Sequence, residues 1–239
     1  MEIFNFKSAP EASLSASNPA SKSPKNQITD LKPGVRNQNR VNVFLDGEFS
    51  FSLDLTQVVD FHLRIGQTLT ADELVNLKHA SAYGKLYART LEWVLTRPHS
   101  IKETRDHLRE KRFQNHADYT DADINQIIAK LVSKNYLNDQ KFATWFIENR
   151  FLKKGISARR LRQELTQKGI NQDLITELLE HSPRNEAEEI QKVIQKRGPK
   201  TSDPQKLLAY LARHGFPLDL SRPLVEEFYN NQELPEPTL

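Results

Sequence analysis

The sequence predicts a mainly α fold: three tandem three-helix repeats forming an elongated array, preceded by a small β-hairpin-containing N-terminal element and a disordered tail. Two observations predict the array, namely a helical periodicity from Leu74 to Tyr229 and the recurrence of one helical segment three times. A third observation, alternation of apolar and polar residues around an Asp-Gly pair, predicts the hairpin.

Residues 1–38 are expected to form the disordered N-terminal tail. They are rich in Ser, Asn, Ala and Lys, contain four prolines and show no lasting hydrophobic period. Such a stretch buries too little apolar surface to offset the entropy that ordering removes. Order is therefore expected to begin with the hairpin.

The stretch RVNVFLDGEFSFSL predicts that hairpin. A two-residue loop at Asp46-Gly47 pairs Val43 with Ser50 and mixes the two faces of the sheet. A three-residue loop that also includes Leu45 pairs Val43 with Phe49 and keeps apolar residues together. We therefore expect the three-residue loop, with its glycine in the left-handed position of a bulge.

A short helix and a turn at Gly66 are expected to follow the hairpin. Residues Thr70 to Glu73 have the form of a capping box that opens a helix. The N-terminal element is thus expected to span residues 39–73. A lone hairpin is marginally stable in water, so this one is expected to pack against another element.

The recurring helical segment defines the repeats. Its copies are SIKETRDHLREKRF (100–113), SARRLRQELTQKGI (157–170) and DPQKLLAYLARHGF (203–216). Each copy opens with a good N-cap residue and carries a leucine five residues before its end. The second and third copies end in glycine plus an apolar residue, as a left-handed helix stop requires.

One helix before each copy and one after it complete a three-helix unit. The units are expected at residues 74–138, 139–182 and 183–230, followed by a C-terminal tail at 231–239. In such an array each unit buries its apolar stripe against its neighbours. Long surfaces rather than deep pockets result, which favours an extended partner.

Composition argues against several classes of site. The chain has no cysteine, so it has no disulfide, thiolate metal site or cysteine nucleophile. Its eight glycines form no phosphate-binding loop, and its seven histidines lack metal-binding spacing. We therefore expect a non-enzyme with no cofactor, no metal and no small-molecule substrate, in which His99 and His107 lie on solvated helix surface.

Hydropathy predicts a cytoplasmic protein that makes no membrane contact. No apolar run approaches the ~20 residues of a membrane span, and the N-terminus lacks an apolar signal core. The absence of cysteine also fits a reducing compartment.

Charge is unevenly distributed along the chain. Residues 1–97, 98–170 and 171–239 carry net charges of +1, +6 and −4. The stretch RFLKKGISARRLRQELTQKGI (150–170) alone holds seven cations and one anion. This asymmetry suggests a polyanionic or acidic partner.

Helical geometry separates the cations of this stretch from its core side. Leu161 and Leu165 share one side of the helix, whereas Glu164 lies one turn from both Arg160 and Lys168 and partly neutralises them. The candidate contact residues are the remaining cations, Arg150, Lys153, Lys154, Arg159 and Arg162.

Each candidate also has a structural alternative. Exposed cations often form only a solvated helix face, and Arg150 at the end of a helix would favour the helix dipole. Contact with DNA phosphates gives salt-dependent affinity without sequence reading. Aromatic residues for base stacking are absent from 152–170, and Phe151 is expected in the core, so sequence-specific single-strand recognition is not expected.

The segment YLNDQKFATWFIENRFLKKGISARRLRQELTQKGI (136–170) resembles the RecX family. The matching residues, at fixed spacing, are Tyr136-Leu137, Asp139, Phe142-Ala143, Phe146-Ile147, Arg150, Lys154-Gly155, Leu161, Glu164-Leu165 and Lys168-Gly169-Ile170. A looser resemblance runs from Arg40 to Phe228. Arg112 and Asn135 stand where the family has glycine, so the helix near Arg112 is expected to end differently.

The resemblance implies a non-enzymatic regulator of the RecA recombinase. Members of the family stack three-helix units, bind RecA or the RecA–DNA filament, and modulate its recombinase, ATPase and SOS-related activity. The partners implied are RecA and its filament, with possible non-specific DNA contact. An independent helix-turn-helix-like DNA-binding regulator and a plain scaffold with apolar binding surfaces are the alternatives.

Overall fold

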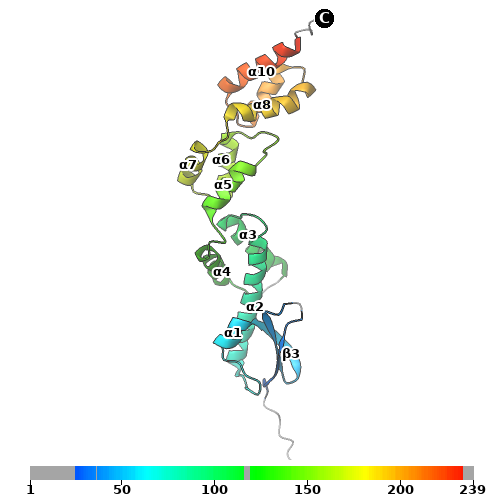
Figure 1. The fold of residues 1–239 in the computed structure, drawn as a ribbon, viewed down its shortest axis with the longest axis vertical. Coiled ribbons are helices and arrows are strands. Elements are labelled where there is room, and N and C mark those ends of the chain that lie inside the picture. Colours follow the sequence, from blue (N-terminus) through cyan, green and yellow to red (C-terminus); the bar gives the residue numbers. More distant parts are fainter. Residues whose placement is uncertain (1–24, 36, 116–118, 234–239) are drawn as a thin grey trace, which may run out of the picture. The chain divides into compact units, whose positions relative to one another are not determined.

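The structure is a computed structural model that describes residues 25–35, 37–115 and 119–233. Within these ranges three strands are followed by ten α-helices (Figure 1). The chain divides into two compact units, Met1–Ser81 and Ala82–Leu239. The expectations for residues 1–24 and 234–239 lie outside the described residues.

The first unit is built on a three-stranded antiparallel sheet. Its strands are β1 (Ile28–Pro33), β2 (Arg40–Leu45) and β3 (Glu48–Asp54), in the order β1-β2-β3. Strand β1 lies within residues 1–38, so the prediction of a disordered tail is wrong for this part. Ile28 is fully buried, and its N–H donates to the carbonyl oxygen of Gln67 at 2.8 Å. Strand β1 thus depends on pairing with β2, from Ile28–Leu45 to Pro33–Val41, and on the bond to Gln67, and local composition reveals neither.

The hairpin between β2 and β3 closes with a two-residue loop, so the predicted three-residue loop is wrong. Leu45 pairs with Glu48, and Asp46 and Gly47 both have positive φ, 52° and 90°. A register shift in β3 then places Val43 opposite Phe51 rather than Phe49 or Ser50. The bulge thereby keeps apolar residues together even though the loop has only two residues.

Two helices complete the first unit as expected. Helix α1 (Leu55–Asp60) leads to a turn in which Gly66 has a φ of 88°. Helix α2 (Ala71–Val94) opens with the predicted capping box: the Thr70 hydroxyl accepts from Glu73 N, and the Glu73 carboxylate accepts from Thr70 N at 2.8 Å. Leu77 of α2 packs into the same buried cluster as the sheet residues, so the hairpin does pack against another element.

The second unit contains three hydrophobic clusters, each built from three helices. The first joins the end of α2 to α3 (Ile101–Asn115) and α4 (Asp121–Ser133). The second joins α5 (Asp139–Asn149), α6 (Ala158–Gln167) and α7 (Gln172–Glu180). The third joins α8 (Glu186–Arg197), α9 (Pro204–Arg213) and α10 (Leu218–Glu233), with the short 3-10 helix η1 (Gly198–Lys200) after α8.

These clusters confirm the mainly α fold, in which three-helix units follow a β-containing element in the sequence. Their members lie at 83–137, 142–179 and 190–229, inside the ranges expected for the three units. The exact boundaries at 74–138, 139–182 and 183–230 stay predictions. Within the described ranges, no helix combines the length and apolar character needed to cross a membrane.

The helix ends follow the predicted chemistry. Gly169 and Gly215 have φ values of 81° and 86°, the left-handed conformation expected of a helix stop. Asn135 also adopts a positive φ, 57°, which asparagine tolerates. Helix α3 runs through Arg112 to Asn115, as the missing glycine suggested, and the Arg112 side chain pairs with Asp121 at 3.3 Å.

His99 contradicts the expectation of a solvated surface position. The ring is 3% exposed and lies 3.6 Å, centroid to centroid, from Trp93. Burial lowers the pKa of His99 from 6.5 to about 4, and the positive charge of Arg97 acts in the same direction. His107 stacks on Trp93 as well, at 4.1 Å, and is half-buried.

Candidate binding surface

Helix α6 and the loop before it carry most of the predicted contact residues. Ser157 caps the helix by accepting from the backbone N–H of Arg160 at 3.2 Å. Leu161 and Leu165 are buried in the core, as the helical spacing predicted. The cations of the helix therefore lie away from the core.

Four of the five predicted residues are exposed cations, namely Lys153, Lys154, Arg159 and Arg162. In the part of the chain that the structure describes, none of their side chains takes part in an ion pair. The nearest interaction is that of the Lys154 ammonium, 5.9 Å from the centre of the Phe151 ring. Their charge is thus available to a partner.

Arg150 differs from the other four. Its Nε donates to Glu164 Oε2 at 2.6 Å, and its guanidinium lies 3.9 Å from the centre of the Phe151 ring. The backbone carbonyl of Arg150 also accepts from Arg184 at 2.7 Å. The Arg150 side chain therefore ties the end of α5 to α6, and its charge is largely offset inside the protein.

Glu164 pairs with a different set of cations from the one predicted. It accepts from Arg160 at 3.0 Å, as expected, but its second partner is Arg150. Lys168 instead reaches Glu103 of α3 at 2.5 Å, because it stands at the end of α6 and its side chain extends to the preceding unit. Burial opposes ionisation of Glu164, yet hydrogen bonds from Arg150 and Arg160 hold its pKa below the ordinary value.

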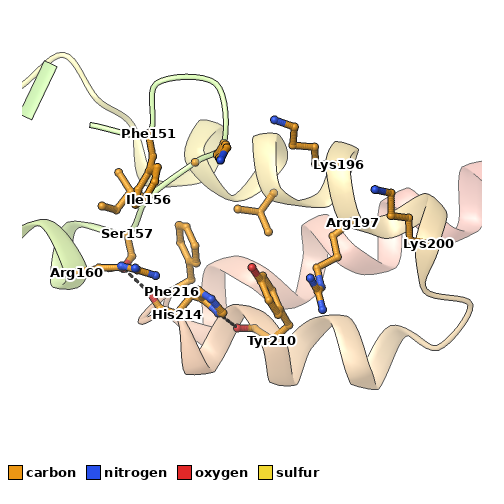
Figure 2. Close-up of a pocket in the computed structure, with 13 residues that line it drawn as sticks. Phe151, Ile156, Ser157, Arg160, Lys196, Arg197, Lys200, Tyr210, His214 and Phe216 are labelled. Atoms are coloured by element: carbon orange, nitrogen blue, oxygen red, sulfur yellow. Dashed lines mark hydrogen bonds between the residues drawn. The ribbon is translucent and has the colours of Figure 1, made fainter. Parts of the chain in front are cut away.

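A hollow of about 340 Å³ lies between the loop before α6 and helices α8 and α9 (Figure 2). We name it the first hollow. Its cations are Lys154, Arg160, Lys196, Arg197 and Lys200. None of the described residues that line it is acidic. Its apolar lining residues include Ile156, Val193 and Phe216, which are buried, and Phe151, which is half-buried.

Planar side chains also line the first hollow. Tyr210 lies between His214 and Arg197 (Figure 2), with the His214 ring and the Arg197 guanidinium each 3.9 Å from the Tyr210 ring. His214 Nδ1 is 2.8 Å from the carbonyl oxygen of Tyr210, which fixes the imidazole on its own helix. These groups lie outside residues 152–170, the stretch in which the sequence predicts no stacking residues.

A second hollow of about 420 Å³ adjoins the first, sharing Arg160 and His214 as walls. Arg159 and Arg213 add two further cations to it. Its one acidic lining residue among those described is Glu164, which is already paired with two arginines. Of the predicted contact residues, the structure thus brings Lys154 to the first hollow and Arg159 to the second.

The junction of the second and third units positions both hollows. The Ser157 hydroxyl donates to the carbonyl oxygen of His214 at 2.7 Å, and Glu186 accepts from Ala158 N at 3.0 Å. Buried Glu189 accepts from Ile156 N at 2.9 Å. These bonds hold the start of α6 against α8 and α9.

Sequence reasoning missed the contribution of α8 and η1. Lys196, Arg197 and Lys200 fall within the run KRGPK, a basic cluster in a terminal third whose net charge is −4. This basic run within an acidic third of the sequence could have indicated further candidate contact residues. The position of Tyr210 and His214 beside these cations could not have been predicted, because it depends on packing between units.

Two family models match parts of the chain. One, described as the regulatory protein RecX N-terminal domain, matches residues 26–70. The other, described as the RecX second three-helix domain, matches residues 138–179 and so includes all five predicted contact residues.

Several known proteins are similar over most of the chain. Regulatory protein RecX of Bacillus licheniformis is 31% identical over 214 residues, which cover 86% of this chain and 79% of that protein. Regulatory protein RecX of Bacillus subtilis is 29% identical over 214 residues, with the same shares covered. A crystal structure of a regulatory protein RecX matches in fold with a TM-score of 0.64 at 22% identity, covering 84% of this chain and 99% of the other. The chain therefore belongs to the RecX family of regulatory proteins.

Proposed function

We propose that this chain is a non-enzymatic regulator that binds the RecA recombinase, or the filament that RecA forms on DNA, in the cytoplasm. Through that contact it modulates the recombinase, ATPase and SOS-related activity of RecA. Membership of the RecX family supports a regulatory role, and the resemblance of residues 136–170 supports RecA as the partner.

The observation that carries the proposed site is the exposed, unpaired charge of α6 and its preceding loop. No ion-pair partner is present among the described residues for Lys153, Lys154, Arg159 or Arg162. The carboxylate of α6, Glu164, pairs with Arg150 and Arg160 instead. The like charges of Arg159 and Arg162, three residues apart on one helix, slightly destabilise it, which favours a role in binding a partner. We assign Arg150 to positioning this surface rather than to the contact itself.

Charge reversal of Arg159 and Arg162 tests the proposal. The double variant R159E/R162E is expected to lose its effect on DNA-dependent ATP hydrolysis by RecA while keeping its helical circular dichroism, because both side chains are exposed and unpaired. The variant K134E/K141E reverses two exposed charges on other elements and serves as the matched control. Unchanged modulation by R159E/R162E would refute the assigned site.

The helix-turn-helix alternative makes a different prediction. It requires a recognition helix that reads bases in the major groove, usually from a two-fold dimer. Helix α6 exposes Arg159, Arg162 and Gln163, which are side chains of a suitable kind. Footprinting on duplex DNA without RecA separates the two functions, since a discrete protected site supports only the alternative.

A further inference from the structure

We infer that the first and second hollows together bind a single-stranded nucleic acid, with one nucleotide in the first hollow and a neighbouring phosphate in the second. This inference extends the proposed function, because it assigns direct strand binding to the chain itself. Its test contains no RecA, so either proposal can fail while the other stands.

The charge of the two hollows favours a polyanionic ligand. Seven cations line them, namely Lys154, Arg159, Arg160, Lys196, Arg197, Lys200 and Arg213. The single carboxylate among the described lining residues is that of Glu164, and it offsets Arg160 and Arg150. Because the hollows meet at Arg160 and His214, one chain of phosphates can follow both.

The hydrogen-bonding groups favour a phosphodiester over an acidic peptide. Lysine and arginine side chains are donors without acceptors. A phosphodiester backbone presents acceptors alone, whereas an extended peptide also brings N–H groups that need acceptors. In the first hollow, the Ser157 hydroxyl and the Tyr210 carbonyl are already engaged with Arg160 N and with the His214 ring. The Tyr210 hydroxyl and the amides of Gln163 and Gln167 in the second hollow can still accept, but the seven cations offer many more donors than these acceptors can match.

The apolar lining of the first hollow favours a ligand that has an apolar part besides a phosphate. Half-buried Phe151 and Tyr210 line the same space of about 340 Å³ as the cations, so aromatic surface is open to a ligand there. An inorganic polyanion would leave this surface in water, whereas a nucleobase covers it. The bases of a duplex are held inside the stack, so the base must come from a single strand.

The stack of His214, Tyr210 and Arg197 supplies a planar wall for that base. Arg197 is exposed, and its guanidinium is the outer layer over Tyr210. Guanidinium planes and aromatic rings both stack on bases without regard to base identity. The site is therefore expected to bind strands with little sequence preference.

Fluorescence anisotropy of a labelled oligothymidylate of about twelve nucleotides tests the inference. The unaltered chain is expected to bind it with a salt-dependent affinity. K196A/K200A removes two exposed cations of the first hollow and is expected to weaken binding about tenfold, and to reduce the slope of log affinity against log salt by about 1.4. K134A/K141A, which removes the same charge from exposed positions outside both hollows, is the matched control and should bind as the unaltered chain does.

Competition identifies the ligand. Unlabelled single strand should displace the probe, whereas duplex, polyphosphate, thymidine monophosphate and polyglutamate at equal charge should do so at least tenfold less well. Absence of strand binding at low salt, or equal binding by K196A/K200A and K134A/K141A, overturns the site. If polyphosphate or duplex displaces the probe equally well, the base has no role in binding. If the monophosphate does so, binding does not need a strand. If polyglutamate does so, the hollows bind an acidic peptide instead.

Discussion

The side-chain hydroxyl of Ser157 donates a hydrogen bond to the backbone carbonyl oxygen of His214, 2.7 Å away. Ser157 also caps α6, so one side chain both begins a helix and fastens it to the end of α9. Ser100 repeats this arrangement one unit earlier: it caps α3 and donates to the carbonyl oxygen of Lys168 at 2.8 Å. Each helix start is thus joined to the corresponding helix end of the next unit.

A carboxylate strengthens each of these junctions. Asp139 accepts from the backbone N–H of Ile101 at 2.8 Å, and Glu186 accepts from that of Ala158 at 3.0 Å. Both carboxylates lie in the first turn of the next unit's first helix. An anion beside a helix N-terminus is favourable, which explains physically why an aspartate stands at position 139.

Replacing Ser157 with Ala tests the junction. The change removes an N-cap and leaves the His214 carbonyl without its donor, so we expect the free energy of unfolding to fall by about 2 kcal/mol. Urea denaturation followed by circular dichroism measures this. Exposed Ser202 provides the control, and S202A should be within about 0.5 kcal/mol of the unaltered chain. Equal midpoints for S157A and S202A would show that the junction contributes nothing.

Gly155 is constrained by both conformation and space. Its φ is 77°, and a Cβ atom there would collide with the carbonyl oxygen of Glu189 and with the Val193 side chain. Gly66 has a similar φ of 88° with nothing near the position of a Cβ. G66A is therefore expected to cost about 1 kcal/mol through backbone strain, and G155A distinctly more. Thermal unfolding of both variants shows whether close packing, in addition to the positive φ, requires glycine at position 155.

The Glu164 ion pairs are expected to stabilise the protein by an amount that depends on pH. Because the folded state lowers the pKa of Glu164 below its ordinary value of 4.5, the stabilisation is present above that pH and is lost as pH falls through the folded pKa. We expect E164Q to be about 1 kcal/mol less stable near neutral pH, since both arginines are partly exposed.

The matched control for this prediction is E148Q, which changes an exposed glutamate that forms no ion pair in the described part of the chain. The stability difference between E164Q and E148Q should shrink as the pH falls below 4.5, the ordinary pKa of Glu164. A difference that persists unchanged into acid would mean that the side chain acts through packing rather than through its charge.

Local signals were enough to predict the helix starts and stops. Ser100, Ser157 and Asp203 cap their helices, and Gly169 and Gly215 end theirs, because these interactions involve residues within one turn. The same locality explains why the capping box at Thr70 could be predicted from four residues.

Contacts between distant residues account for what the sequence did not reveal. Strand β1 pairs with β2 and bonds to Gln67, and the hairpin register depends on a bulge that places Val43 opposite Phe51. The pairing of Arg150 with Glu164 spans a loop, so helical spacing suggested Lys168 in its place. The four exposed cations could be predicted from the sequence pattern, whereas the two hollows depend on how α6 packs against α8 and α9.

His99 predicts a second pH dependence in a higher range. Burial keeps its folded pKa at about 4 against 6.5 in the unfolded chain, so in this window the unfolded state binds a proton that the folded state does not. Arg97 and His107 act in the same direction as burial, whereas Glu103 opposes them. Stability is therefore expected to fall by about 3 kcal/mol as the pH decreases from 6.5 to 4.

Substitution of His99 with Phe removes the titrating group while keeping a ring against Trp93. H99F is expected to lose most of the decline in unfolding free energy between pH 6.5 and 4, whereas H181F, altered at an exposed histidine, should retain it. Urea titrations at several pH values measure the slope directly. Parallel slopes for H99F and H181F would mean that His99 is protonated in the folded protein, in which case its burial against Trp93 does not exclude charge.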